Sequence, residues 1–245
     1  MRLTGKFQMK LTAIIFLFLC SCQHPDQKGP KTIQHSDADT VVDSRSYEEI
    51  RAGISLKKKE YSKKYPERKS LDDSHAMAEL TNYWVNEIST TLFEKWKGTP
   101  WDFNGTTTEP KQGEIACGYF VTTILQAMDL SINRQKLSTC ASSEMMKSLV
   151  PDQKLKILNY LSYPSFNDSL THLGKGVYII GLDFHTGFIV NDGHDNWFIH
   201  SNYIQRKGVT KETVMSSDAL KVSKTRWMVS LTGDTTFLYK WLTRD

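Results

Sequence analysis

The 245-residue sequence predicts an α+β protein in which N-terminal helices pack on an antiparallel sheet. Apolar residues recur at helical spacing through residues 47–96 and again directly behind Cys117. Short runs rich in Val, Ile, Phe and Tyr, bounded by turn residues, follow in residues 176–202 and 226–232. Because the strands follow the helices rather than alternating with them, the order indicates the α+β class.

Residues 1–21 predict a signal peptide rather than part of the fold. Arg2, Lys6 and Lys10 give a positive start, and residues 11–19 form an apolar core. This core is shorter than the roughly 20 apolar residues that a membrane-spanning helix needs. Cleavage removes three of the 31 Lys and Arg residues and none of the 27 Asp and Glu residues, so the remaining charges nearly cancel. This balance argues against a nucleic-acid partner.

Residues 19–22, Leu-Cys-Ser-Cys, resemble the bacterial lipobox, whose last cysteine is lipidated after cleavage. The resemblance implies a lipid on Cys22 that anchors the protein to a membrane of the bacterial cell envelope. Gln23 stands where an aspartate is associated with inner-membrane retention, which favours a periplasm-facing anchor in the outer membrane. The polar residues 22–45 lack an apolar period and predict a flexible tether.

Residues 46–245 have the length of a single domain of roughly 200 residues, expected to be a monomer. A helix is predicted over residues 47–65, with Ile50, Ile54 and Tyr61 on its apolar side. Its other side carries Lys57, Lys58, Lys59, Lys63 and Lys64, interpreted as a solvated face, with attraction to an anionic polymer or lipid surface as the alternative. A second helix is expected from a cap at residues 72–74 to about Trp96.

Cys117 follows the turn-prone residues 106–113 and precedes an apolar helical pattern that includes Phe120, Ile124 and Met128. We therefore expect the cysteine at a helix N-terminus. The free amide groups and the helix dipole there favour the thiolate and lower the thiol pKa. The alternative is a small buried core residue.

Residues 176–190 predict two strands around a short turn, with His185 at the start of the second, and residues 196–202 predict a third strand. A cysteine at a helix start, His185 and a polar residue on the next strand, His200, match the arrangement of thiol hydrolases. In such a site His185 accepts the proton of Cys117, His200 orients His185, and the Cys117 backbone N–H binds the oxyanion.

The same residue types also suit other chemistry. His185, His194 and His200 with Asp183 or Asp192 are a conceivable zinc set, but their spacing matches no helical zinc motif. No metal or cofactor is therefore predicted. The same triad also suits an acyltransferase of the transglutaminase type, and a catalytically inactive binding lipoprotein is a third possibility.

Four segments together resemble the NlpC superfamily of papain-like cell-wall cysteine peptidases: residues 98–105, 116–121, 185–187 and 198–200. The resemblance implies a papain-like fold and a cysteine peptidase or amidase that cuts peptidoglycan stem peptides. The implied bond is γ-D-glutamyl to a diamino acid, with a muramoyl-alanine amidase as the variant. The residues implied to contact substrate are Trp101, Asp102, Gly118, Tyr119 and Thr186. Trp101, Ala116 and Gly118 stand where the family usually has tyrosine, aspartate and serine.

Residues 131–174 are interpreted as an insertion with a helix at residues 152–161. It is expected to pack over one edge of the sheet, or alternatively to form a wall beside the cleft. Cys140, within it, is expected to be a free and at least partly buried thiol, because a disulfide to Cys117 would consume the nucleophile. Residues 203–225 are predicted to be a polar connection, and the apolar residues 237–242 to cover the far side of the sheet.

Overall fold

The computed structural model describes residues 43–244. The predicted signal peptide, Cys22 and residues 23–42 of the tether lie outside the described residues. The helices are α1 (Tyr47–Lys64), η1 (Arg68–Leu71), α2 (Ser74–Asn86), η2 (Glu87–Leu92), α3 (Phe93–Trp96), α4 (Cys117–Ala127), α5 (Arg134–Thr139), α6 (Ser142–Leu149), η3 (Asp152–Lys154), α7 (Tyr163–Leu173), η4 (Ile204–Arg206), η5 (Val214–Ser216), α8 (Asp218–Val222) and α9 (Thr235–Thr243). The strands are β1 (Lys156–Ile157), β2 (Gly176–Gly181), β3 (Thr186–Asn191), β4 (Asn196–Asn202), β5 (Gly208–Thr213) and β6 (Trp227–Ser230).

Helix α1 confirms the first predicted helix. It begins at a capping box, in which the Ser46 hydroxyl accepts from the Glu49 amide and the Glu49 carboxylate accepts from the Ser46 amide. The predicted apolar side is buried. The prediction of a solvated lysine face is wrong for Lys58, because its ammonium group is buried between α1 and the ends of α4 and α9.

The second predicted helix is also confirmed, as the uninterrupted run of α2, η2 and α3 that ends at Trp96. The Asp73 carboxylate caps its start by accepting from the His75 amide. The middle segment η2 is a π-helix. After the run, Gly98 has a φ of +79°, and its amide donates to the Val209 carbonyl, which ties the turn to β5.

No helix within residues 43–244 combines the length and the apolarity needed to cross a membrane.

Six strands within residues 43–244 form one antiparallel sheet in the order β1-β6-β2-β3-β4-β5. Strands β2, β3, β4 and β6 lie where the sequence predicts them. Strand β5 corrects the prediction that residues 203–225 are only a polar connection. It is an edge strand with the sequence Gly-Val-Thr-Lys-Glu-Thr, so it lacks the apolar content that identifies a buried strand.

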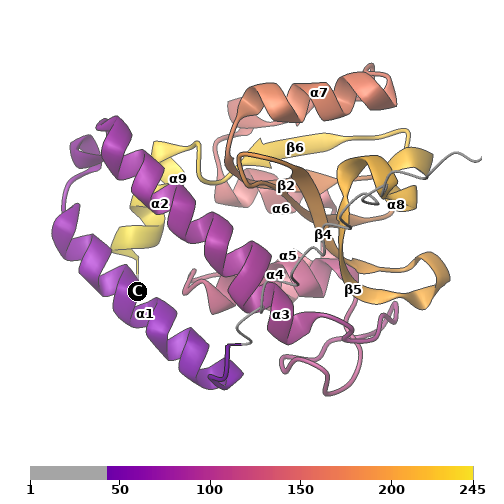
Figure 1. Cartoon of the computed structure of the whole chain (residues 1–245), viewed down its shortest axis with the longest axis horizontal. Coiled ribbons are helices and arrows are strands. Elements are labelled where there is room, and N and C mark those ends of the chain that lie inside the picture. Colours follow the sequence, from indigo (N-terminus) through magenta and orange to yellow (C-terminus); the bar gives the residue numbers. More distant parts are fainter. Residues whose placement is uncertain (1–42, 245) are drawn as a thin grey trace, which may run out of the picture. The chain divides into compact units, whose positions relative to one another are not determined.

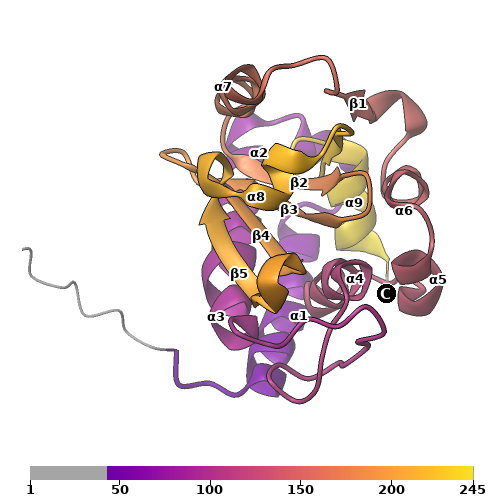
Figure 2. The ribbon, with the colours of Figure 1, turned by 90° about the vertical axis from the view of Figure 1, so that its right-hand side faces the viewer.

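Helices cover both faces of the sheet (Figures 1 and 2). Along β2, Val177 and Ile179 face the core shared with α1, α2, α4, α6 and α9. Tyr178 and Ile180 face a second core shared with α7 and α8. This two-sided burial explains why all six residues of β2 are buried. The fold is therefore α+β, as predicted.

The apolar C-terminal patch forms helix α9, which lies between α1 and α2 in Figure 1. The Trp241 ring contacts that of Trp84 at a centroid distance of 5.3 Å. The patch is thus buried, as expected, but it adds to the N-terminal helix layer instead of sealing the sheet by itself.

The helix predicted at residues 152–161 is wrong. This stretch contains a short turn, η3, and the two-residue strand β1, which pairs with β6. The helix starts later, at α7, because the Ser162 hydroxyl accepts from the Ser165 amide and Pro164 occupies the first turn. Two further helices lie earlier in the segment: α5 lies beside α4, and α6 follows α5 and packs on β2 and β6 (Figure 2).

Candidate active site

Cys117 is the first residue of α4, as the sequence predicts. Ala116 is the N-cap in extended conformation and offers no side chain to the helix amides. Its own amide donates to the Gly105 carbonyl, and the Ile115 amide donates to the Pro100 carbonyl. A β-bridge between Thr106 and Ile115 closes the loop between them. These backbone bonds fix the position at which the chain enters α4, and so the position of Cys117.

His185 ends the four-residue turn between β2 and β3. The Leu182 amide donates to the His185 carbonyl across this turn at 2.7 Å. The Asp183 carboxylate accepts from the amides of Lys224 and Thr225 at 2.8 and 2.9 Å, which binds the turn to the segment before β6. These bonds lower the Asp183 pKa. The turn that carries His185 is therefore fixed by one hydrogen bond within the turn and by two to the segment before β6.

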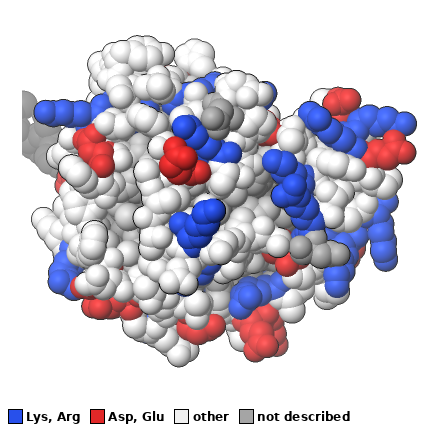
Figure 3. All heavy atoms as spheres, turned by 180° about the vertical axis from the view of Figure 1, so that it is seen from behind, with Lys and Arg blue, Asp and Glu red and all other residues white. Residues whose placement is uncertain are grey.

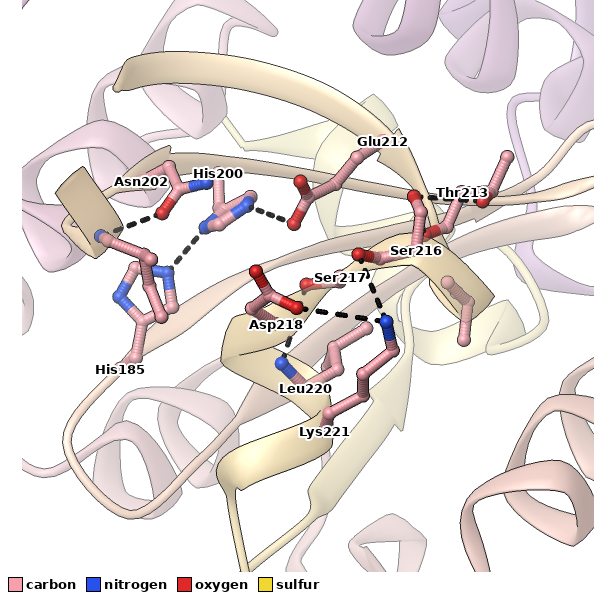
Figure 4. Close-up of polar contacts among 12 residues, drawn as sticks. His185, His200, Asn202, Glu212, Thr213, Ser216, Ser217, Asp218, Leu220 and Lys221 are labelled. Carbon is pink, nitrogen blue, oxygen red and sulfur yellow. Dashed lines mark hydrogen bonds and ion pairs between the residues drawn. The ribbon is translucent and has the colours of Figure 1, made fainter. Parts of the chain in front are cut away.

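His200 lies on β4, and its Nδ1 is 2.7 Å from Nε2 of His185 (Figure 4). Both rings are buried, with 5% of His185 and 0% of His200 exposed. The neighbouring Gly187 on β3 makes this approach possible, because a Cβ there would lie 2.8 Å from the His200 Cβ. The ring of Phe198 stacks on that of His200 at a centroid distance of 3.9 Å. The predicted pair of histidines is thus brought together in one rigid arrangement.

Glu212 continues the same chain of side chains. Its Oε1 lies 3.2 Å from His200 Nε2 (Figure 4). It comes from β5, where it is opposite Phe198 and therefore diagonal to His200 on the same face of the sheet. Glu212 was not predicted as a site residue, because the sequence of residues 208–213 did not indicate a strand. The available signal was weak: the β-branched residues Val209, Thr210 and Thr213, which favour strands.

Cys117 and His185 line one cleft of about 770 Å³. One wall, called the α5–α6 wall, comes from α5, α6 and the loop between them, and a second wall comes from the segment between α8 and β6. The first wall, which includes Ser138, Cys140 and Met145, belongs to the predicted insertion. That insertion therefore borders the cleft instead of packing only on the sheet edge. Cys117 and Cys140 are both partly buried free thiols.

The five predicted substrate contacts divide into two groups. Gly118 and Thr186 line the cleft, whereas Trp101, Asp102 and Tyr119 do not. The latter three interact with cations elsewhere: the Arg206 guanidinium lies over the Trp101 ring and 3.0 Å from the Asp102 carboxylate, and the Arg134 guanidinium lies over Tyr119.

Tyr203 is a neighbour of the site that the sequence analysis did not single out. Its ring lies edge-on to the His185 ring at a centroid distance of 5.0 Å, and 6.3 Å from the Trp101 ring. The Tyr203 ring is thus a neighbour of both the His185 and the Trp101 rings. Burial raises the pKa of the Tyr203 phenol, and the nearby Cys117 acts in the same direction.

The electrostatics of Cys117 correct one expectation. Burial raises its thiol pKa, although the backbone amides of Thr186, Gly118 and Cys117 itself act in the opposite direction. The helix start thus has the predicted effect, but desolvation of the thiolate is larger. Burial also lowers the His185 pKa well below its ordinary value, with His200 acting in the same direction. Burial lowers the His200 pKa as well, despite Glu212. Near pH 7 the resting site therefore holds a neutral thiol and neutral imidazoles.

The alternative zinc set is not assembled. His194 lies in the turn between β3 and β4, at the opposite end of these strands from His185 and His200. The Asp192 carboxylate in the same turn accepts from the Trp197 indole at 2.7 Å. Across residues 43–244, no group of three or more His, Cys, Asp or Glu side chains is arranged to hold a metal ion.

The face seen from behind in Figure 3 carries Lys and Arg side chains interspersed with Asp and Glu. The described residues of the cleft lining include one acidic and one basic side chain, Asp183 and Lys224.

The chain was compared with family models, curated proteins and solved structures, and none of them matches it.

Proposed function

We propose that the chain is a cysteine hydrolase that cleaves amide bonds through Cys117, His185 and His200. The observation that carries the proposal is the shared cleft of Cys117 and His185 together with the 2.7 Å contact between His185 and His200. A nucleophile, a base and a group that orients the base are the three parts that thiol acyl transfer requires.

In the proposed reaction, His185 accepts the Cys117 proton while Sγ attacks the substrate carbonyl. The Cys117 backbone N–H, at the start of α4, donates to the oxyanion of the tetrahedral intermediate. The C–N bond then breaks, and the His185 imidazolium returns its proton to the leaving amine. Water, deprotonated by His185, then attacks the thioester. The C–S bond breaks, the acid product leaves, and the His185 imidazolium returns its proton to the Cys117 thiolate.

Support for a papain-like fold of the NlpC type comes from the order of the parts. A cysteine heads a helix that packs on an antiparallel sheet, with His200 on strand β4 and His185 directly before the adjacent strand β3. The departure at Gly118 has a local cause: a Cβ at this position would lie 2.3 Å from the Ser138 carbonyl oxygen. The family's usual serine is therefore incompatible with the position of the α5–α6 wall.

We infer the substrate from the family resemblance: peptidoglycan stem peptides, cut at a γ-D-glutamyl bond to a diamino acid. A cleft of about 770 Å³ falls in the usual range of about 300–1,000 Å³ for ligand sites. Ser138, Ser142 and Ser143 in its wall offer hydroxyl groups to a peptide backbone. A lipid on Cys22 would hold the enzyme at the outer membrane, facing the periplasm.

The test is release of fragments from purified peptidoglycan by the full-length protein in detergent, followed by mass spectrometry. We expect defined muropeptides from the wild type and from Cys140→Ala, but none from Cys117→Ala. Cys140→Ala is the matched control because Cys140 lines the same cleft. No release by folded wild-type protein would contradict the proposed substrate, and release by Cys117→Ala would contradict the proposed nucleophile.

A further inference from the structure

The hydrogen-bond chain of the site ends on a carboxylate, not on a histidine. His185 Nε2 contacts His200 Nδ1 at 2.7 Å, and His200 Nε2 contacts Glu212 Oε1 at 3.2 Å (Figure 4). The His200 side chain is 0% exposed and that of Glu212 is 18% exposed. Water therefore has no access to His200 and little to Glu212. In each of these two contacts, one atom must donate a hydrogen bond and the other must accept it.

Glu212 is an ionised acceptor. Burial raises its pKa, but hydrogen bonds from His200 and Ser217 outweigh burial and give a pKa below the ordinary value. Ser217 is fully buried and caps α8 by accepting from the Leu220 amide, so its position is fixed. The positive charge of Lys207 also acts to lower the Glu212 pKa, and the Glu212 charge acts to raise the pKa of Tyr163.

An ionised carboxylate accepts hydrogen bonds and cannot donate them. His200 must therefore carry its proton on Nε2, which leaves Nδ1 as an acceptor, because neutral imidazole has one of each. His185 must then donate from Nε2 to His200 Nδ1. It follows that Nδ1 of His185 carries no proton and has a free lone pair.

We propose that Glu212 is a positioning residue that fixes the His185 tautomer through His200 and so makes Nδ1 the atom that accepts the Cys117 proton. The inference rests on the proposed function, since it assigns the base within the same site. Glu212 does not line the cleft, so it acts without touching substrate. The stacked Phe198 ring and the close Gly187 keep His200 from rotating out of the chain.

The first test uses the wild-type protein and requires no activity. In full-length protein labelled with ¹⁵N at histidine, in detergent at pH 7.5, the ¹⁵N shifts of the imidazoles report which nitrogen is protonated. We expect Nε2–H on both His185 and His200, assigned with His185→Gln and His200→Gln. Protonated Nδ1 as the major form of either ring would overturn the proposal.

The second test replaces the carboxylate by an amide in Glu212→Gln. The amide can donate to His200 Nε2, so we expect Nδ1–H forms to appear on both rings. The kcat should fall by about 10²–10⁴-fold with little change in KM, as a wrong base tautomer predicts. Glu212→Asp keeps an acceptor and should restore part of kcat and the Nε2–H forms.

The matched control is Asp218→Asn, which removes a carboxylate close by in Figure 4 that contacts Lys221 and no histidine. It should leave the histidine shifts and kcat within about twofold of wild type. Unchanged histidine shifts and kcat in Glu212→Gln would overturn the role of Glu212. A tautomer switch in a protein that hydrolyses no stem peptide would instead contradict the proposed function while leaving the role of Glu212 intact.

Discussion

At the scale of the residue, Cys117 combines two features that oppose each other. Its place at the start of α4 and the nearby Thr186 amide favour the thiolate, while burial favours the neutral thiol and prevails. The position of Cys117 at a helix N-terminus was predictable from the helical spacing of the apolar residues that follow it. The extent of burial was not, because it depends on the α5–α6 wall, which no local pattern identifies.

The raised thiol pKa leads to a prediction about alkylation. The rate at which iodoacetamide modifies Cys117 should be low at pH 7 and should still be rising at pH 9, because only the thiolate reacts. Peptide-resolved mass spectrometry of the modified protein measures it, and Cys117→Ala identifies the contribution of Cys140. A rate that reaches its plateau below pH 8 would show that the resting site is a thiolate and contradict this account.

At the scale of the element, the well-predicted parts are those whose own residues carry the signal. Strands β2, β3 and β4 are apolar and separated by clear turns, and α1 has a complete capping box. Strand β5 pairs with β4, and helices α5 and α6 are too short to carry an apolar period over several turns. Because Glu212 lies on β5, the last member of the hydrogen-bond chain was missed together with its strand.

The close packing around His200 leaves no room for a side chain at Gly187 on β3. A Cβ there would lie 2.7 Å from the Phe198 ring and 2.8 Å from the His200 Cβ. Gly187→Ala should therefore destabilise the fold by about 1–3 kcal/mol through overpacking, and it should also lower activity by displacing His200. Urea unfolding followed by circular dichroism measures the stability.

Gly53→Ala is the control for that variant. Gly53 lies inside α1, and a Cβ there would meet only an Arg45 nitrogen at 3.5 Å. Alanine should stabilise this helix interior by about 0.5–1 kcal/mol. If both glycine variants changed stability in the same direction, the packing account of Gly187 would be wrong.

At the scale of the whole domain, a buried lysine joins elements that are far apart in the chain. The Lys58 ammonium donates to the carbonyls of Asp129 and Arg244 at 2.9 and 2.7 Å, and it lies 3.4 Å from the Asp129 carboxylate. Only 5% of the residue is exposed. The sequence placed Lys58 in a run of lysines, and only the tertiary packing distinguishes it from its neighbours.

Lys58→Met should therefore destabilise the domain by about 1–3 kcal/mol, because it removes the donor from both partly buried hydrogen bonds and leaves the Asp129 carboxylate without this cation. The neighbouring Lys59 is exposed, so Lys59→Met should change the free energy of unfolding by less than about 0.5 kcal/mol. Thermal unfolding of the two variants makes the comparison. Equal effects would show that Lys58 is an ordinary surface lysine.

The two buried histidines make domain stability depend on pH. Their pKa values are lower in the folded protein than the ordinary 6.5 of an unfolded chain, so the unfolded state binds more protons. The stability is fully present above about pH 6.5 and is lost as pH falls toward the folded-state pKa values. In that window the free energy of unfolding changes by up to about 1.4 kcal/mol per pH unit for each histidine.

Urea unfolding at pH 7.5 and pH 5.5 tests this dependence. The wild type should lose more stability between the two conditions than the variant His185→Gln, which retains only His200 of the pair. His75→Gln, at an exposed position, should behave like the wild type. A loss that is the same in wild type and His185→Gln would contradict the assignment to the buried pair.

The proposed reaction requires a covalent bond between Cys117 Sγ and the acyl part of the substrate. The most direct measurement is acid quenching of the full-length enzyme during turnover of a γ-D-glutamyl stem peptide, followed by peptide mapping by mass spectrometry. The account predicts a thioester adduct on the Cys117 peptide in the wild type, and none in Cys117→Ala. Hydrolysis that continues in Cys117→Ala, or an adduct on Cys140 instead, would contradict it.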